Sequence, residues 1–217
     1  MNISQTRFPA SRKISLGGTG IVKKIEIGGD APVSIQTMWK EGITSVLKDS
    51  PLYAKDALTS ILNRIETLSN LGCDIIRFAV PDTESARSLC LIAQYSKTPL
   101  VADIHFDYKL ALECLKGSIA KIRINPGNIG SKEKTEIVVK ACMEKGAAIR
   151  IGVNTGSFPK DIQTKVESGS MSRAEGLCET ASRESEVLES LRFTNYCVSM
   201  KASSVQETIE ANELFVL

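Results

Sequence analysis

The sequence lacks several features that define common classes of protein. No apolar run approaches the roughly 20 residues that span a bilayer, and the polar stretch from Met1 to Lys13 has no apolar segment of the kind that marks a secretory signal. The net charge is only +2 over 217 residues, so the composition does not suggest a nucleic acid or an anionic membrane as partner. We therefore expect a cytoplasmic globular protein with neither a membrane nor a nucleic acid as partner.

Metal-binding and nucleophilic signatures are also missing. The six cysteines form no CxxC pair and no metal-finger spacing, and most lie in apolar, periodic segments. We expect them to be reduced thiols, mostly buried, and we expect no metal site. His105 is the single histidine, and no local motif pairs it with a cysteine, so no catalytic residue is predicted. The cysteines are Cys73, Cys90, Cys114, Cys142, Cys178 and Cys197.

A repeated unit is what the sequence does contain: a strand rich in β-branched residues followed by a helix. Strands are predicted at 33–38, 74–80, 99–105, 120–125, 148–154 and 196–202, and helices at 51–71, 83–96, 108–116, 132–145, 173–191 and from 204 onward. This alternation with short connections predicts an α/β fold with a parallel sheet. Because no G-x-G-x-x-G loop follows the first strand, a (β/α)8 TIM-type barrel is favoured over a dinucleotide-binding fold. About six of its βα units are present, so the predicted barrel is incomplete.

Three other segments have predicted roles. Residues 1–12 are predicted to be an N-terminal tail, and 13–217 the partial barrel. Within 13–27, Gly17-Gly18-Thr19-Gly20 predicts the turn of an antiparallel β-hairpin that caps one end of the barrel. The polar, aperiodic stretch 160–172 is predicted to be a surface loop.

The sequence also predicts where helices begin and end. Helix N-caps are expected at Asp82 and Ser131, and glycines are expected to end helices at Gly72, Gly117 and Gly146.

Charged side chains alternate with apolar ones along the predicted strands. In Lys121-Ile122-Arg123-Ile124-Asn125, the isoleucines face the helices, so Arg123 and Asn125 face the barrel interior. The same reasoning places seven further side chains inside: Arg77, Asp103, His105, Arg150, Asn154, Ser199 and Lys201.

Four cations from four strands thus converge with one carboxylate, which is costly unless a polyanion binds. One arginine in a strand more often forms a salt bridge on the exterior. Four cations at matching positions of four strands instead favour a ligand site. Arginine binds phosphate oxygens in a forked geometry, and barrel active sites lie at the carboxyl ends of the strands. The pattern predicts a site for a phosphorylated small molecule.

Longer motifs now carry a family resemblance. VADIHFDYKLAL (101–112), KIRINPGNIG (121–130), IRIGVNTGS (149–157), VSMKAS (198–203) and SIQTM (34–38) closely resemble the 4-hydroxy-3-methylbut-2-enyl diphosphate synthase family. The resemblance spans nearly the whole chain. It implies a bacterial oxidoreductase of the methylerythritol phosphate route to isoprenoids, which reductively opens and dehydrates 2-C-methyl-D-erythritol 2,4-cyclodiphosphate.

The resemblance also implies roles for the residues above. Arg77, Arg123, Arg150 and Lys201 would hold the substrate's phosphate oxygens, while Asp103, His105, Asn125 and Asn154 would complete the pocket, with Ser199 facing it. The family's [4Fe–4S] cluster lies in a separate C-terminal domain, receives electrons from flavodoxin or ferredoxin, and works in a homodimer.

This sequence departs from the family because the cluster-binding CPxC and GCxVNGPGE stretches do not occur in it. We therefore expect a fragment that lacks the iron–sulfur domain, is inactive alone, and is aggregated or poorly folded when isolated. Two alternatives remain open. One is a pteroate-synthase-like TIM barrel that binds another phosphorylated ligand, and the other is a non-catalytic fragment.

Overall fold

The fold comes from a computed structural model that describes residues 11–47 and 51–216. Most of the predicted N-terminal tail, residues 1–10, lies outside the described residues. No helix among the described residues is long and apolar enough to cross a membrane.

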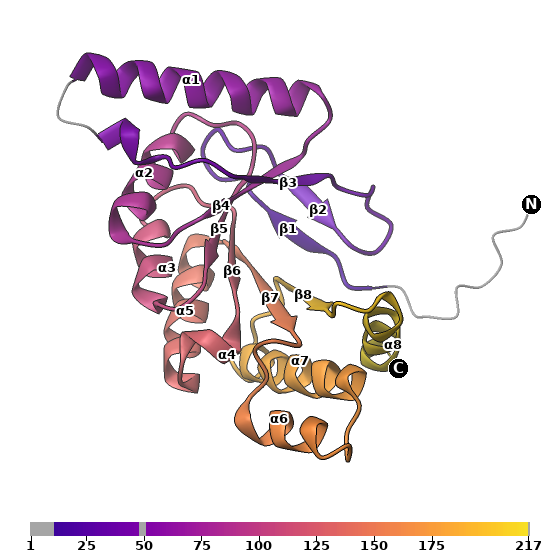
Figure 1. Ribbon diagram of the computed structural model, residues 1–217. Coiled ribbons are helices and arrows are strands. Elements are labelled where there is room, and N and C mark those ends of the chain that lie inside the picture. Colours follow the sequence, from indigo (N-terminus) through magenta and orange to yellow (C-terminus); the bar gives the residue numbers. More distant parts are fainter. Residues whose placement is uncertain (1–10, 48–50, 217) are drawn as a thin grey trace, which may run out of the picture.

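The central element is a six-stranded parallel sheet whose strands follow one another in chain order. It curves into part of a barrel (Figure 1), which confirms the predicted α/β architecture. Its strands are β3 (Gln36–Trp39), β4 (Ile75–Ala79), β5 (Leu100–Ile104), β6 (Lys121–Ile124), β7 (Ala148–Asn154) and β8 (Tyr196–Lys201).

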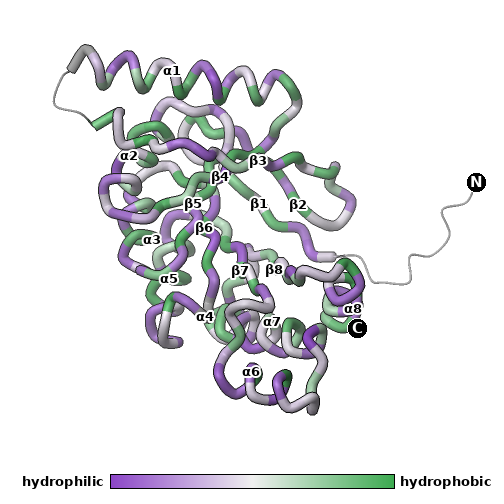
Figure 2. The backbone as a smooth tube through the Cα atoms, in the orientation of Figure 1, coloured by the Kyte–Doolittle hydropathy of each residue, from purple (hydrophilic) through white to green (hydrophobic). Residues whose placement is uncertain are grey.

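Helices cover the outer face of this sheet, as Figure 1 shows. Along α1, apolar residues that pack on the core alternate with polar ones, so green and purple alternate along this helix in Figure 2. The helices of the described chain are, in order, the 3-10 turn η1 (Thr44–Leu47), α1 (Pro51–Asn70), α2 (Thr83–Ala93), α3 (Tyr108–Cys114), α4 (Pro126–Ile129), α5 (Lys132–Lys145), α6 (Lys160–Glu167), α7 (Arg173–Ser190) and α8 (Val205–Val216).

The main core lies between the sheet and these helices. The outward-facing strand residues are fully buried there, among them Ile122, Ile124, Ile149 and Ile151. Their burial confirms the predicted alternation, and it leaves the residues between them facing the barrel interior. The sheet therefore fixes the direction of each charged side chain in the candidate site.

The prediction of a surface loop over 160–172 is wrong, because the helix α6 occupies the first part of this stretch. Only Ile162 of this helix is buried, so the segment shows little apolar periodicity in the sequence. The helix packs on α7 beside Gly176, where an added Cβ would lie 3.1 Å from Ile162 Cγ2. The helix is therefore favoured by tertiary packing that its own sequence does not reveal.

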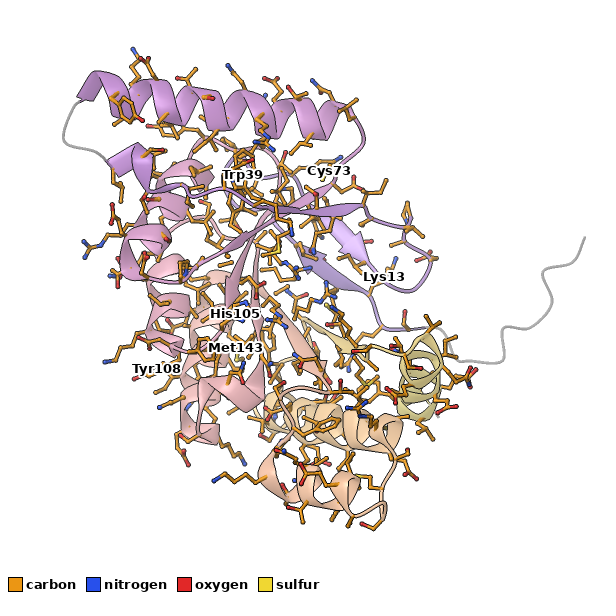
Figure 3. The ribbon with its side chains drawn as sticks, viewed as in Figure 1. Lys13, Trp39, Cys73, His105, Tyr108 and Met143 are labelled. Carbon is orange, nitrogen blue, oxygen red and sulfur yellow. The ribbon has the colours of Figure 1, made fainter. Side chains whose placement is uncertain are left out.

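The first strand of the sheet starts later than predicted. Val33 is 94% exposed and lies outside β3, which extends instead to the buried Trp39. Within residues 11–47 and 51–216, β3 is an edge strand that pairs with β4 alone. Trp39 stacks on Phe78 with the ring centroids 5.3 Å apart, beneath α1 (Figure 3), so it covers part of the core.

The predicted hairpin is present as β1 (Ile14–Leu16) paired antiparallel with β2 (Ile25–Ile27). Its connection is longer than a tight glycine turn and runs from Gly17 to Lys24. Ile14 and Leu16 are buried in a second apolar cluster, with Ile75, Val101, Ala120 and Ala148 of the sheet. The hairpin therefore closes the amino-terminal end of the barrel interior.

Helix ends mostly agree with the sequence. Asp82 caps α2 by accepting a hydrogen bond from Ser85 N at 2.7 Å, whereas Ser131 occupies the N-cap of α5 without a side-chain bond. Gly146 ends α5 as predicted and adopts a left-handed conformation. Gly117 does not adopt this conformation; it is needed because a Cβ there would lie 2.9 Å from Cys90 Cα.

Candidate functional site

The candidate site lies inside the half-barrel, toward the carboxyl ends of the strands. Strand register aligns Asp103 of β5 with Arg123 of β6, and Arg123 with Arg150 of β7. On the other side of β5, Arg77 of β4 is in register with Val101. Parallel pairing thus brings together residues that are far apart in the sequence.

Asp103 is the carboxylate around which the cations gather. Its side chain is only 4% exposed, and its Oδ1 accepts a hydrogen bond from Arg123 Nη1 at 3.0 Å. Its Oδ2 lies 3.5 Å from Arg77 Nε. His105 Nε2 is 3.5 Å from Oδ1, and the imidazole is half exposed at the cavity. Figure 3 shows His105 near the centre of the molecule.

Arg77 is incompletely satisfied. Its Nε is buried and has no hydrogen-bond partner among the described residues. Its Nη2 donates only to the thioether of Met38, at 3.1 Å, which is a weak acceptor. Buried donors are normally paired, so this guanidinium has capacity for a ligand oxygen.

Arg150 is held by a neighbouring strand. Its Nε donates to Ser199 Oγ on β8 at 3.0 Å. Burial, together with the nearby Arg77 and Arg123, lowers the pKa of Arg150. Both effects disfavour the charged form, so a negative ligand at this position would be strongly favoured.

Gly152 makes room for Arg123. A Cβ at residue 152 would lie 2.5 Å from Arg123 Nε and 2.6 Å from its Nη2. The guanidinium therefore lies directly against the backbone of β7. Any other residue at this position would displace it from Asp103 or deform the strand.

These side chains line an open cavity of about 720 Å³. Eight of the nine predicted site residues belong to it: Arg77, Asp103, His105, Arg123, Arg150, Asn154, Ser199 and Lys201. Asn125 does not line the cavity, since it is buried and donates from Nδ2 to Ser157 Oγ at 2.9 Å.

The charges in this cavity do not balance. Arg77, Arg123, Arg150 and Lys201 face the single carboxylate Asp103 among its lining residues. The summed charge of these five side chains is therefore +3. The arrangement can bind a compact polyanion through several forked guanidinium contacts at once.

The sequence reasoning missed Lys121. It occupies the same inward face of β6 as Arg123, two residues earlier, yet it is only 2% exposed. Counting the strand period backward from Arg123 would have identified it. Met38 and Gly152 were also missed, and neither has a chemical signal in the sequence.

The described residues do not fit a metal cluster. No three His, Cys, Asp or Glu side chains among them could hold a metal ion, and all six cysteines are free. Burial raises the pKa of Cys114 and Cys142, so these remain inert thiols.

Comparison with known proteins now adds to this geometry. Residues 19–217 match the family model described as the GcpE TIM-barrel domain. The chain belongs to this family. The match covers every strand of the parallel sheet and every cavity residue, and it confirms the family resemblance and the TIM-type fold.

Three relatives of this chain have the same name, 4-hydroxy-3-methylbut-2-en-1-yl diphosphate synthase (flavodoxin). The protein of Treponema denticola is 48% identical over 94% of this chain and 54% of its own length. That of Treponema pallidum is 47% identical over 94% and 50%, and that of Clostridium acetobutylicum 41% over 94% and 52%. The chain thus spans about half the length of the curated relatives it matches.

Solved structures with the same fold are much more distant in sequence. A 7,8-dihydropteroate synthase from Vibrio fischeri gives a TM-score of 0.52 at 11% identity, covering 87% of this chain and 66% of that one. A type I 3-dehydroquinate dehydratase from Clostridium difficile gives 0.51 at 13%, covering 89% and 81%. At this identity the likeness concerns the barrel fold alone.

Proposed function

We propose that this chain is the substrate-binding barrel of a 4-hydroxy-3-methylbut-2-enyl diphosphate synthase, an oxidoreductase of isoprenoid biosynthesis. Its substrate would be 2-C-methyl-D-erythritol 2,4-cyclodiphosphate, which it would open reductively with loss of water. The observation that carries the proposal is the cavity in which four cations face one carboxylate. The family membership favours this substrate over a pterin or another phosphorylated ligand.

The cations would act both on binding and on reaction. Arg77, Arg123 and Arg150 would hold the diphosphate oxygens, with Lys201 at the rim and Asn154 beside it. Opening the ring breaks a carbon–oxygen bond and leaves an additional negative charge on the diphosphate. Cations fixed in advance by Asp103 and Ser199 would stabilise that charge as it develops.

His105 and Asn125 would have supporting roles. His105 is exposed enough to donate a hydrogen bond to the ligand while it stays beside Asp103. Asn125 would act indirectly by fixing Ser157, the residue to which its amide donates. The loop after β7 would then be held against the ligand.

The electrons would come from outside this barrel. The relatives' names specify flavodoxin, and we propose that the longer protein uses flavodoxin or ferredoxin, a [4Fe–4S] cluster and a homodimeric assembly in the bacterial cytoplasm. Such a cluster supplies single-electron reduction when bound. The described residues of this chain do not fit it and contribute no electron-transfer step, so we expect the barrel alone to bind substrate without turnover.

Calorimetric titration with the cyclodiphosphate tests this function. Arg123→Ala and Arg150→Ala should each weaken binding by roughly 1.5–3 kcal/mol, the usual cost of a lost charged hydrogen bond. Arg87→Ala is the matched control, because Arg87 lies on the outer surface and pairs with Glu113. Equal affinity of all three variants, or tighter binding of a pterin, would contradict the proposal.

A further inference from the structure

Lys121 lies on the inward face of β6, one layer below the cavity residue Arg123. Its Cα is in register with Val101 of β5 and Ala148 of β7. Val101 is itself in register with Arg77 of β4, so Lys121 and Arg77 belong to the same layer of the barrel interior. Arg77 lines the cavity from that layer, and a lysine side chain is nearly as long.

The surroundings of Lys121 are cationic above and apolar below. Its ammonium interacts electrostatically with Cys197, Arg150 and Arg77. The next layer contains Asp103 and Arg123. Val101 and Ala148 flank Lys121 in its own layer, and apolar side chains of the hairpin and the lower sheet lie beneath: Ile14, Leu16 and Ile75.

Lys121 has no counter-ion in the part of the chain that the structure describes. Neither a salt bridge nor a hydrogen bond of its ammonium occurs within residues 11–47 and 51–216. The carboxylate that lines the cavity, Asp103, is already engaged by Arg123, Arg77 and His105. Burial, with smaller contributions from Arg150 and Arg77, lowers the pKa of Lys121 to about 8. A buried lysine without a partner is costly, and an apolar residue would fill the same space without that cost.

We propose that Lys121 is a further anion-binding residue, whose ammonium becomes paired only when a diphosphate occupies the cavity above it. The small neighbours Val101 and Ala148 leave the side chain free to extend toward Arg77 and the ligand. The inference rests on the proposed function, since it takes the diphosphate as the occupant.

Proton uptake should accompany binding. Around pH 8 the empty barrel holds Lys121 partly neutral, and a nearby polyanion favours its charged form. Each phosphorus of a cyclodiphosphate carries one strongly acidic oxygen, so the ligand itself does not titrate in this range. Any proton taken up on binding near pH 8 therefore comes to the protein.

The experiment is titration of the chain with the cyclodiphosphate at pH 8 in two buffers of different ionisation enthalpy. The wild type should take up a proton fraction of up to about one half at Lys121, and Lys121→Met should lose this part of the uptake and bind about ten-fold or more weakly. Lys121→Arg keeps the charge, so it should retain binding and lose the uptake. Lys132→Met, at an exposed lysine of α5, is the control and should match the wild type.

Folding of the variants is checked by thermal unfolding, in which Lys121→Met should be at least as stable as the wild type because it removes a buried unpaired charge. Wild-type binding with the same affinity and proton uptake in Lys121→Met would overturn this inference alone. Failure of the wild type itself to bind the cyclodiphosphate would overturn the proposed function and this inference with it.

Discussion

At the scale of single residues, one glycine decides where Arg123 can lie. The guanidinium occupies the space that a side chain at residue 152 would need, with Arg123 Nε 2.5 Å from the ideal Cβ position. Its bond to Asp103 depends on that space. The precision of the cation cluster therefore rests on the absence of a side chain.

Gly152→Ala should displace Arg123 and weaken cyclodiphosphate binding by about ten-fold, the equivalent of one charged hydrogen bond. Calorimetry on the purified chain measures this. Gly42→Ala serves as the control, since a Cβ at Gly42 meets nothing within 4 Å. Unchanged affinity of Gly152→Ala would show that Arg123 has no part in binding.

Lys121 should also make the stability of the folded chain depend on pH. Its pKa is lowered from 10.5 to about 8 in the folded chain, so between these values the unfolded chain binds more protons and stability rises with pH. Over the whole range from below pH 8 to above pH 10.5, this shift raises the free energy of unfolding by roughly 3 kcal/mol. Urea unfolding at pH 7.5 and pH 10 should show this increase in the wild type relative to Lys121→Met. Parallel pH dependence of the two proteins would refute it.

At the scale of elements, the helices owe their positions to both caps and packing. Ser172 caps α7 with a full capping box, in which its Oγ accepts from Glu175 N and Glu175 accepts from Ser172 N. Ser131 occupies the corresponding position of α5 but makes no such bond. The two serines are therefore a natural pair for measuring what a cap contributes.

Ser172→Ala should destabilise the chain by about 1 kcal/mol, and Ser131→Ala by clearly less. Chemical denaturation of both variants gives the comparison directly. Equal losses would mean that the side-chain bond in the capping box adds nothing to the stability of α7.

At the scale of the whole molecule, the parallel sheet has two edges, β3 and β8. Exposed apolar residues precede β3, with Val33 94% and Ile35 58% exposed. An unprotected strand edge beside apolar side chains favours pairing with another chain.

We therefore expect the 217-residue chain to self-associate as its concentration rises, which sedimentation measures. Ile35→Lys should reduce the association by adding charge beside β3. Met143→Lys, at an exposed residue of α5, a helix that contacts β7 rather than an edge strand, should leave it unchanged. A chain that stays monomeric over the whole range would contradict this expectation.

Local patterns in the sequence determined the repeated strand–helix unit and the inward direction of Arg77, Arg123 and Arg150, because alternation along a strand depends on that strand alone. Only the tertiary structure decided what each inward side chain meets. The pairing of Asp103 with Arg123, the isolation of Lys121 and the redirection of Asn125 to Ser157 all depend on register and packing between strands and loops. The helix α6 also depends on α7, since contacts between distant segments leave no periodic trace in either one.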